Sequence, residues 1–310
     1  LKVLTKIFRK PYNDLTEGFV ELRDQQANDY VRDQIHQAKN GLMVSKWGTT
    51  ELGTVCSLLS DDLHIPLKDI YEGKVSYDRT GSVAWLVNNS GFFPNSLPAG
   101  EKFAHLALED AREIDILGSY AKLEYYVRNY TEKARKINLN GYYAPFLWEN
   151  PWTKELKGKK VLVVHPFAET IKKQYDKREH LFENPDVLPE FKKLTVIKAV
   201  QSIAGNSSET GFKDWFEALD FMKNQMDQSD YEIALIGCGA YGMSLAAHAK
   251  RHGKIAIHMA GWTQMLFGIY GNRWIKDQPE FKKYINEYWT RPSIDERPKN
   301  VEKVEGGCYW

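Results

Sequence analysis

The sequence is poor in cysteine and has no excess of charge of either sign. Its 310 residues include three cysteines, far apart and without a CxxC pair. This predicts neither a disulfide framework nor a zinc finger, and it favours a cytoplasmic setting. Lys and Arg number 42 against 41 Asp and Glu, a net charge of +1. Because duplex-DNA binding usually requires a strongly basic surface, no nucleic acid is expected among the partners.

Long apolar runs are also missing. No stretch approaches the ~18 to 20 residues that a membrane-spanning helix needs, and the start of the chain lacks the long apolar region of a signal peptide. Residues 1–10 place Leu1, Leu4 and Phe8 on one helical face with basic residues around it. Two interpretations stay open: a solvated N-terminal arm, or a segment that makes peripheral contact with an anionic membrane surface.

Aromatic residues, in contrast, are abundant. The chain has 9 Trp, 17 Tyr and 14 Phe, 13% of its residues. Rings in this number build a large core or line a groove for sugars or bases. Many of them gather in residues 120–152.

Short aliphatic runs alternate with helical patterns along most of the chain. We expect strands at 42–48, 114–118, 161–164, 194–197, 232–236 and 254–258. The unbroken aliphatic character of residues 161–164 is typical of a parallel strand that is buried on both faces. The alternation predicts an α/β fold: a Rossmann-like, doubly wound, mostly parallel sheet with helices on both faces.

The same patterns suggest how the chain is organised. We expect an N-terminal arm (1–23), one large α/β domain (24–290) and a C-terminal tail (291–310). A division of the domain into 24–157 and 158–290 is the alternative. In such sheets, ligands bind at the carboxyl ends of the strands, so the residues that follow each strand are the candidates for a site.

A glycine-rich turn follows the strand at 232–236. Gly237, Gly239, Tyr241 and Gly242 belong to the segment GCGAYG, which can bring a phosphate to backbone N–H groups at a helix N-terminus. NAD binding also needs an acidic residue at the end of the next strand, but that strand ends at His258, followed by Met-Ala-Gly. Two interpretations of the glycine-rich turn remain open. It binds another nucleotide or a phosphate, or its glycines are required only for close packing.

Two further strand ends carry titratable side chains. His165 follows the strand at 161–164, and its imidazole either faces the ligand or caps the strand through a backbone hydrogen bond. Glu51 lies in the first turn of a helix, where it is a metal ligand, a general base or a residue that stabilises the helix dipole. It has no second carboxylate beside it, because its neighbours are Thr49 and Thr50.

Several motifs of known chemistry are missing. There is no P-loop lysine motif and no GxSxG nucleophile turn. His248 and His252 are four residues apart, but no HExxH motif surrounds them. They are therefore predicted to lie on a solvated helix face.

Three segments together resemble GT-D-type bacterial glycosyltransferases. Residues 42–51, LMVSKWGTTE, resemble the strand–RFGDGE–helix opening of that family. Residues 233–272 resemble the C-terminal half of its catalytic domain, and residues 161–169 the strand and turn between them. The ending, VEGGCYW, is similar to that of proteins from bacterial surface-polysaccharide loci. The resemblance covers residues 24–275.

The resemblance implies sugar transfer from a nucleotide diphosphate donor to a glycan or lipid-linked acceptor. In the family, the acids of a D-x-E motif hold Mn²⁺ or Mg²⁺ on the diphosphate; Glu51 matches the Glu, but Thr49 stands where the family has Asp. The enzyme is then either independent of metal, with helix N-termini and cationic side chains at the diphosphate, or inactive. If a metal binds, Glu51 is its ligand.

By this resemblance, the catalytic residues are Glu51 and His165, and the rings of residues 120–152 offer surfaces on which the acceptor stacks. The residues expected to bind the nucleotide sugar come from three strand ends: Trp47, Gly48, Thr49, Thr50, Gly237, Gly239, Tyr241, Gly242 and His258. Two other functions remain open. One is a non-catalytic nucleotide- or glycan-binding protein, and the other is another Rossmann-type cofactor enzyme, such as a methyltransferase.

Overall fold

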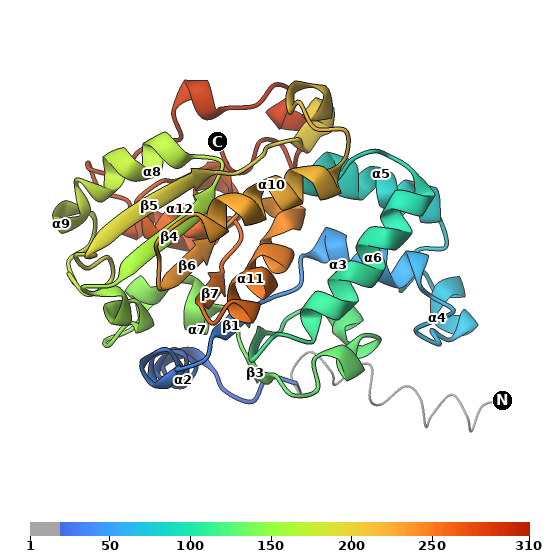
Figure 1. The fold of residues 1–310 in the computed structure, drawn as a ribbon, viewed down its shortest axis with the longest axis horizontal. Helices are drawn as coiled ribbons and strands as arrows, with labels where there is room; N and C mark the ends of the chain where they lie inside the picture. The colour runs from blue at the N-terminus through green and yellow to red at the C-terminus, as the bar shows by residue number, and fades with distance from the viewer. Residues whose placement is uncertain (1–18) are drawn as a thin grey trace.

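Seven parallel strands form one continuous sheet in the computed structural model, which describes residues 19–310 (Figure 1). The basic segment 1–10 lies outside the described residues. The strand order is β3-β2-β1-β7-β6-β4-β5. The strands are β1 (Leu42–Ser45), β2 (Ile116–Gly118), β3 (Arg135–Ile137), β4 (Lys160–His165), β5 (Lys193–Lys198), β6 (Ile233–Ile236) and β7 (Ile255–His258).

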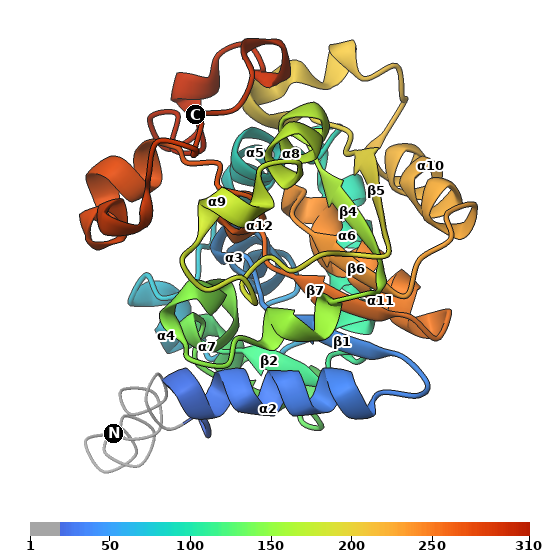
Figure 2. The ribbon, with the colours of Figure 1, turned by 90° about the vertical axis from the view of Figure 1, so that its left-hand side faces the viewer.

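Helices cover both faces of this sheet, as the alternating pattern predicts (Figures 1 and 2). In β4, Leu162 and Val164 pack into one hydrophobic cluster, while Val161 and Val163 pack into the other. The first cluster holds the apolar sides of α3 (Thr49–Leu58), α5 (Arg79–Ser90), α6 (Leu97–Ala111), α10 (Trp215–Asp227) and α11 (Gly242–Arg251). The second holds those of α2 (Asp24–Gln37), α7 (Asn140–Tyr143), α8 (Ala168–Tyr175), α9 (Arg178–Leu181) and α12 (Trp262–Leu266). The α/β, Rossmann-like fold is therefore confirmed.

The remaining helices are short. α4 (Leu67–Tyr71) precedes α5. Within residues 19–310, ten single-turn or slightly longer segments of 3₁₀ or π type occur in the connections and in the C-terminal part of the chain. The longest helix among residues 19–310, α6, has 15 residues. None of the helices in this range combines the length and the apolar character that crossing a bilayer requires.

One strand was not expected from the sequence. β3 contains only three residues, Arg135, Lys136 and Ile137, and the first two are charged. It pairs with β2 at the edge of the sheet. Because it is short and only Ile137 is buried, β3 lacks the aliphatic run by which the other strands can be recognised.

The aromatic stretch at 120–152 is largely part of the interior. Tyr142 and Trp152 have exposed fractions of 0%, and Tyr126 and Tyr143 are also buried. The Trp152 indole donates a hydrogen bond to the Tyr142 carbonyl (2.9 Å). The expectation that this stretch forms a stacking surface for an acceptor is therefore wrong for Tyr142 and Trp152, whose rings fill the core.

The strand order creates places where the connections diverge. β4 is followed by β5 on one side, while β6, which lies on the other side of β4, is followed by β7. The chain leaves β1 towards β2, away from the neighbouring β7. Diverging connections leave a crevice at the carboxyl ends of the strands. Since β7 lies between β1 and β6, both halves of the chain contribute to this crevice.

Candidate active site

A cavity of about 410 Å³ lies at the carboxyl ends of the central strands. The segments after β1, β4, β6 and β7 all line it, together with the end of α5 and the last residues of the chain. Nine of the eleven residues predicted from the sequence are brought together here: Gly48, Thr49, Thr50, Glu51, His165, Gly237, Gly239, Tyr241 and His258. The topology places them side by side although they are up to 210 residues apart in sequence.

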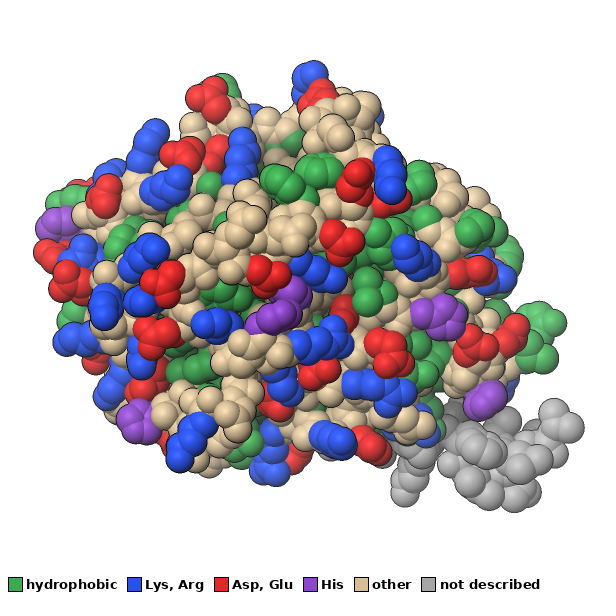
Figure 3. All heavy atoms as spheres, in the orientation of Figure 1, with side chains coloured by type: hydrophobic (Ala, Val, Ile, Leu, Met, Phe, Trp, Pro, Cys, Tyr) green, Lys and Arg blue, Asp and Glu red, His purple; other side chains and the backbone are tan. Residues whose placement is uncertain are grey.

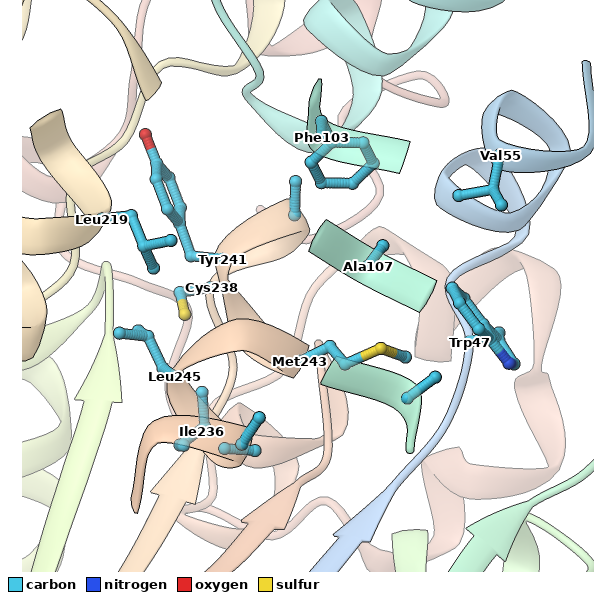
Figure 4. Close-up of a cluster of buried hydrophobic side chains, with 14 of the residues drawn as sticks. Trp47, Val55, Phe103, Ala107, Leu219, Ile236, Cys238, Tyr241, Met243 and Leu245 are labelled. Atoms are coloured by element: carbon cyan, nitrogen blue, oxygen red, sulfur yellow. The ribbon is translucent and has the colours of Figure 1, made fainter. Parts of the chain in front are cut away.

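Trp47 does not line the cavity. Its side chain has an exposed fraction of 1% and belongs to the hydrophobic cluster that contains Val55 and Phe103 (Figure 4). In extended backbone, successive side chains point to opposite sides, so Trp47 enters the core while Lys46 lines the cavity. The prediction that Trp47 binds the nucleotide sugar is therefore wrong.

Gly242 is the second predicted residue outside the lining. It begins α11, and a Cβ atom at this position would lie 2.2 Å from Nε2 of His258. The absence of a side chain allows α11 to pack against the end of β7. Gly242 therefore serves the packing of α11, and the structure does not place it where it was predicted to contact a nucleotide.

The other two glycines of the turn also approach the protein's own atoms. A Cβ on Gly237 would lie 2.3 Å from the carbonyl oxygen of Ala260, and one on Gly239 would lie 2.6 Å from that of Ser90. Gly239 has a φ of +58°, in the left-handed region that favours glycine. These contacts support the interpretation of GCGAYG as a tightly packed turn, although Gly237 and Gly239 still line the cavity.

Lys46 is the residue that the sequence analysis missed. It lines the cavity, and its ammonium lies 5.7 Å from the centre of the Tyr120 ring. Burial disfavours the charged ammonium, but interactions with Tyr143, Tyr120 and Glu51 outweigh this effect and raise the pKa of Lys46 above its usual value. Among residues 19–310, no carboxylate is within ion-pair distance of Lys46. The cavity therefore contains a cation without a direct counter-ion.

Two carboxylates line the described part of the cavity. Glu305 forms an ion pair with Arg273. The Glu51 carboxylate lies against the start of its own helix, since a Cβ on Gly48 would lie 1.8 Å from Oε2 of Glu51. This position near the N-terminus of α3 is favourable for a negative charge, and it leaves Glu51 next to the cavity without an ion-pair partner among residues 19–310.

His165 makes the backbone contact that was one of its two interpretations. Its Nδ1 accepts a hydrogen bond from the backbone N–H of Phe167 (3.0 Å), and burial lowers its pKa to about 3. A neutral imidazole whose Nδ1 accepts carries its proton on Nε2. His165 also lines the cavity, so the capping role and a role towards a ligand are compatible.

His258 is a second neutral imidazole in the lining. Burial, together with the charge of Lys46, lowers its pKa to about 3. Its Nδ1 lies 3.0 Å from Oγ of Ser45, and its buried Nε2 has no hydrogen-bond partner among the described residues. Both histidines are uncharged at neutral pH, so Lys46 and Arg273 supply the positive charge of the cavity.

The last residues of the chain close one side of the cavity. The Arg273 guanidinium lies 4.6 Å from the centre of the Tyr309 ring. The backbone N–H of Arg273 donates to the Cys308 carbonyl (2.8 Å), and Nε2 of Gln264 donates to the Tyr309 carbonyl (3.2 Å). The segment predicted as a C-terminal tail is thus part of the wall, together with a residue, Arg273, that no sequence pattern had indicated.

Thr49 and Glu51, which the resemblance matches to the metal-binding acids of GT-D-type glycosyltransferases, do not form a suitable site for a divalent cation. Thr49 Oγ1 lies 3.0 Å from the Tyr120 hydroxyl, which in turn donates to the Trp47 carbonyl (2.9 Å). Mg²⁺ and Mn²⁺ require several oxygen ligands, of which carboxylates are the strongest. Besides Glu305, which pairs with Arg273, Glu51 is the one carboxylate that residues 19–310 contribute to the cavity lining, and the Lys46 ammonium that interacts with it would repel a metal ion.

Comparisons of the chain with protein-family models, with curated proteins and with solved structures gave no match.

Proposed function

We propose that this protein is a glycosyltransferase that transfers a sugar from a nucleotide diphosphate donor to a glycan or lipid-linked acceptor without a divalent metal. The observation that carries the proposal is the Lys46 ammonium, which lies in a cavity at the carboxyl ends of β1, β4, β6 and β7 and has no ion-pair partner among residues 19–310. Lys46 is partly buried and its ammonium stays charged, so an anionic ligand in the cavity would gain a direct ion pair with it. A diphosphate supplies such an anion.

The roles of the cavity residues follow from their charge and protonation. Lys46 binds the diphosphate and neutralises the charge that develops on it as the bond to the sugar breaks. His165, with its proton on Nε2, donates a hydrogen bond and does not act as a base. Glu51 has no cationic ion-pair partner in the described part of the chain, and it accepts the proton of the acceptor hydroxyl as general base.

The experiment that tests the proposal is a ligand panel followed by a transfer assay. Thermal stability is measured with UDP, GDP, CMP and dTDP, and with NAD and S-adenosylmethionine for the two competing cofactor classes. A ligand at about 100 times its dissociation constant stabilises the fold by about 2.7 kcal/mol. We expect stabilisation by one nucleoside diphosphate that is unchanged by Mn²⁺, and turnover of the matching nucleotide sugar with a glycan acceptor.

A matched pair of variants connects this binding to Lys46. Lys46→Met removes the ammonium and keeps the length of the side chain. The control Lys192→Met removes an exposed ammonium before β5, outside the cavity lining. We expect Lys46→Met to abolish the shift while Lys192→Met retains it. A shift with NAD or S-adenosylmethionine alone would contradict the proposal.

The second candidate function is a nucleotide-binding protein without catalysis. It is favoured by the hydroxyl group of Thr49, which bonds to Tyr120 where the resembled family has a metal-binding carboxylate. Stabilisation by a nucleoside diphosphate without turnover of any nucleotide sugar in the panel would support this candidate and contradict the transferase.

A further inference from the structure

Two histidines and an aspartate meet on the surface at the end of α11, outside the cavity. His248 lies in the last turn of α11 and His252 follows the end of this helix, with their ring centres 4.3 Å apart. Asp227, the last residue of the neighbouring α10, brings its Oδ1 to 2.7 Å from Nε2 of His248. Figure 3 shows histidine side chains gathered in the middle of this face, where Figure 1 has α10 and α11.

We propose that Asp227, His248 and His252 form a binding site for a divalent transition-metal ion, and that Zn²⁺ is the ion that fits it. One potential ligand atom from each residue lies within 4.8 Å of the other two. Two imidazoles with one carboxylate form a ligand set that suits Zn²⁺ and related ions, whereas Mg²⁺ and Ca²⁺ prefer oxygen ligands alone. The sequence predicts a solvated helix face here, because the third ligand comes from another helix.

The hydrogen bonds of His252 prepare it as a ligand. Its Nδ1 lies 2.8 Å from the backbone carbonyl oxygen of His248. A carbonyl oxygen can only accept, so Nδ1 carries the proton and the lone pair of Nε2 is free for a metal in the neutral ring. Metal-binding histidines commonly donate their second N–H to a carbonyl oxygen in this way, which fixes the orientation of the ring.

His248 and Asp227 need only a small adjustment. A carboxylate accepts, so Nε2 of His248 donates a hydrogen bond to Asp227. For a metal ion to bind Nε2 of the neutral ring, this proton must leave Nε2 while Nδ1 of the same ring takes one up from solvent, so that the imidazole stays neutral. Tetrahedral Zn²⁺ holds neighbouring ligand atoms about 3.3 Å apart, against 2.7 Å between these two atoms now.

The site is distinct from the cavity. None of the three residues lines the cavity, and His252 is ten residues beyond Gly242, about 15 Å along the axis of α11. Lys223 of α10, whose charge also acts on His248, has its ammonium 3.7 Å from the Asp220 carboxylate. A bound ion would join the ends of α10 and α11 and so stabilise their packing on the sheet.

Binding is tested by titrating the full chain, prepared without a polyhistidine tag, with Zn²⁺ and separately with Mg²⁺ in a calorimeter. We expect one Zn²⁺ per chain, a higher melting temperature with Zn²⁺, and neither effect with Mg²⁺. Co²⁺ in place of Zn²⁺ should give the visible absorption of a four-coordinate ion. Absence of Zn²⁺ binding by the wild-type chain would overturn the proposal.

His252→Ala removes an exposed ligand with little risk to the fold. Loss of an outer-shell partner costs 10–100-fold in metal affinity, so loss of a direct ligand should cost at least about 100-fold. The matched control is His105→Ala, which removes an exposed histidine 4.0 Å from Asp62, and it should bind Zn²⁺ as the wild type does. Equal Zn²⁺ affinity of His252→Ala and the wild type, as expected if a cysteine held the ion, would also overturn the proposal. Neither result depends on nucleotide binding.

Discussion

The hydroxyl groups of Thr49 and Tyr120 lie 3.0 Å apart, and the Tyr120 hydroxyl also donates to the Trp47 carbonyl. If the resemblance to GT-D-type glycosyltransferases holds, Thr49 stands where that family carries the first acid of its metal site. Lys46 lines the same cavity. A neutral hydroxyl and an ammonium thus occur together in the cavity, where the function that we propose requires an anionic ligand to bind without a metal ion.

Thr49→Asp should give the protein a site for Mn²⁺. Thr49 is exposed at the first position of α3, where a carboxylate also interacts favourably with the helix dipole. With Glu51 two residues later, the variant has two carboxylates at the cavity, and we expect Mn²⁺ to bind roughly tenfold more tightly or better than to the wild type. Isothermal titration with Mn²⁺ measures this. Thr49→Asn keeps the size of Asp without its charge, and an equal gain in that variant would refute the electrostatic explanation.

Acid should destabilise the fold through its two buried neutral histidines. Burial lowers the pKa values of His165 and His258 to about 3, whereas an unfolded histidine titrates near 6.5. The unfolded state therefore binds protons first as the pH falls from about 6.5 towards about 3, and the free energy of unfolding decreases over that window. Each histidine contributes a slope of about 1.4 kcal/mol per pH unit within it.

Urea denaturation of His165→Asn at several pH values between 7 and 4.5 isolates one of these contributions. The Asn side chain retains an acceptor for the Phe167 N–H and has no proton to gain. Its unfolding free energy should therefore depend on pH less steeply than that of the wild type, by about 1.4 kcal/mol per unit below pH 6. Identical slopes would mean that His165 titrates in the folded protein as it does in the unfolded chain.

The fold was predictable where aliphatic side chains carry the signal. Residues 161–164 are buried on both faces of the sheet, so every position had to be apolar and the run was visible. β3 lies at the sheet edge with exposed charges, and its pairing with β2 depends on backbone hydrogen bonds that leave no pattern in the sequence. Glu51 and His165 could be placed together because the carboxyl ends of parallel strands share one edge.

The other residues of the candidate site are harder to predict from the sequence. Lys46 could have been predicted as a site residue. It lies two residues after the buried Val44, and its side chain alternates in direction with that of Trp47. A charged residue in the continuation of a buried strand indicates a side chain that faces a ligand. Arg273 and Tyr309 are different. They line the cavity because the C-terminal segment packs against it. This packing is a tertiary contact that no local sequence pattern indicates.

Gly242→Ala should lower the free energy of unfolding by about 1–3 kcal/mol, the usual cost of overpacking. The added Cβ would lie 2.2 Å from Nε2 of His258, a buried ring that Ser45 helps to hold in place. The control is Gly53→Ala in α3, where a Cβ would meet no atom within 4 Å. This change should stabilise the protein by roughly 0.5–1 kcal/mol through helix propensity. Chemical denaturation of both variants measures the difference, and equal effects would exclude the packing role of Gly242.

Arg273→Met should release the C-terminal segment from the wall of the cavity. The substitution removes the ion pair with Glu305 and the contact with the Tyr309 ring at 4.6 Å. A partly buried cation–π contact is worth about 1–2 kcal/mol, so local opening of residues 301–310 should become roughly tenfold more frequent. Hydrogen exchange of the amides of Cys308 and Trp310, which donate to the carbonyls of Val304 and Gly307, measures this opening.

Arg112→Met is the matched control for this effect, because Arg112 is exposed directly after α6, lies 4.4 Å from the centre of the Tyr130 ring and is outside the cavity lining. It should leave exchange in residues 301–310 unchanged. Arg273→Lys separates charge from shape: it keeps the ion pair with Glu305 but loses the planar group that faces Tyr309, and we expect intermediate exchange. If Arg273→Met exchanges as slowly as the wild type, the backbone hydrogen bond of Arg273 and the side-chain hydrogen bond of Gln264 are sufficient to hold the segment. The guanidinium would then act on a ligand and would not be needed to hold the wall of the cavity.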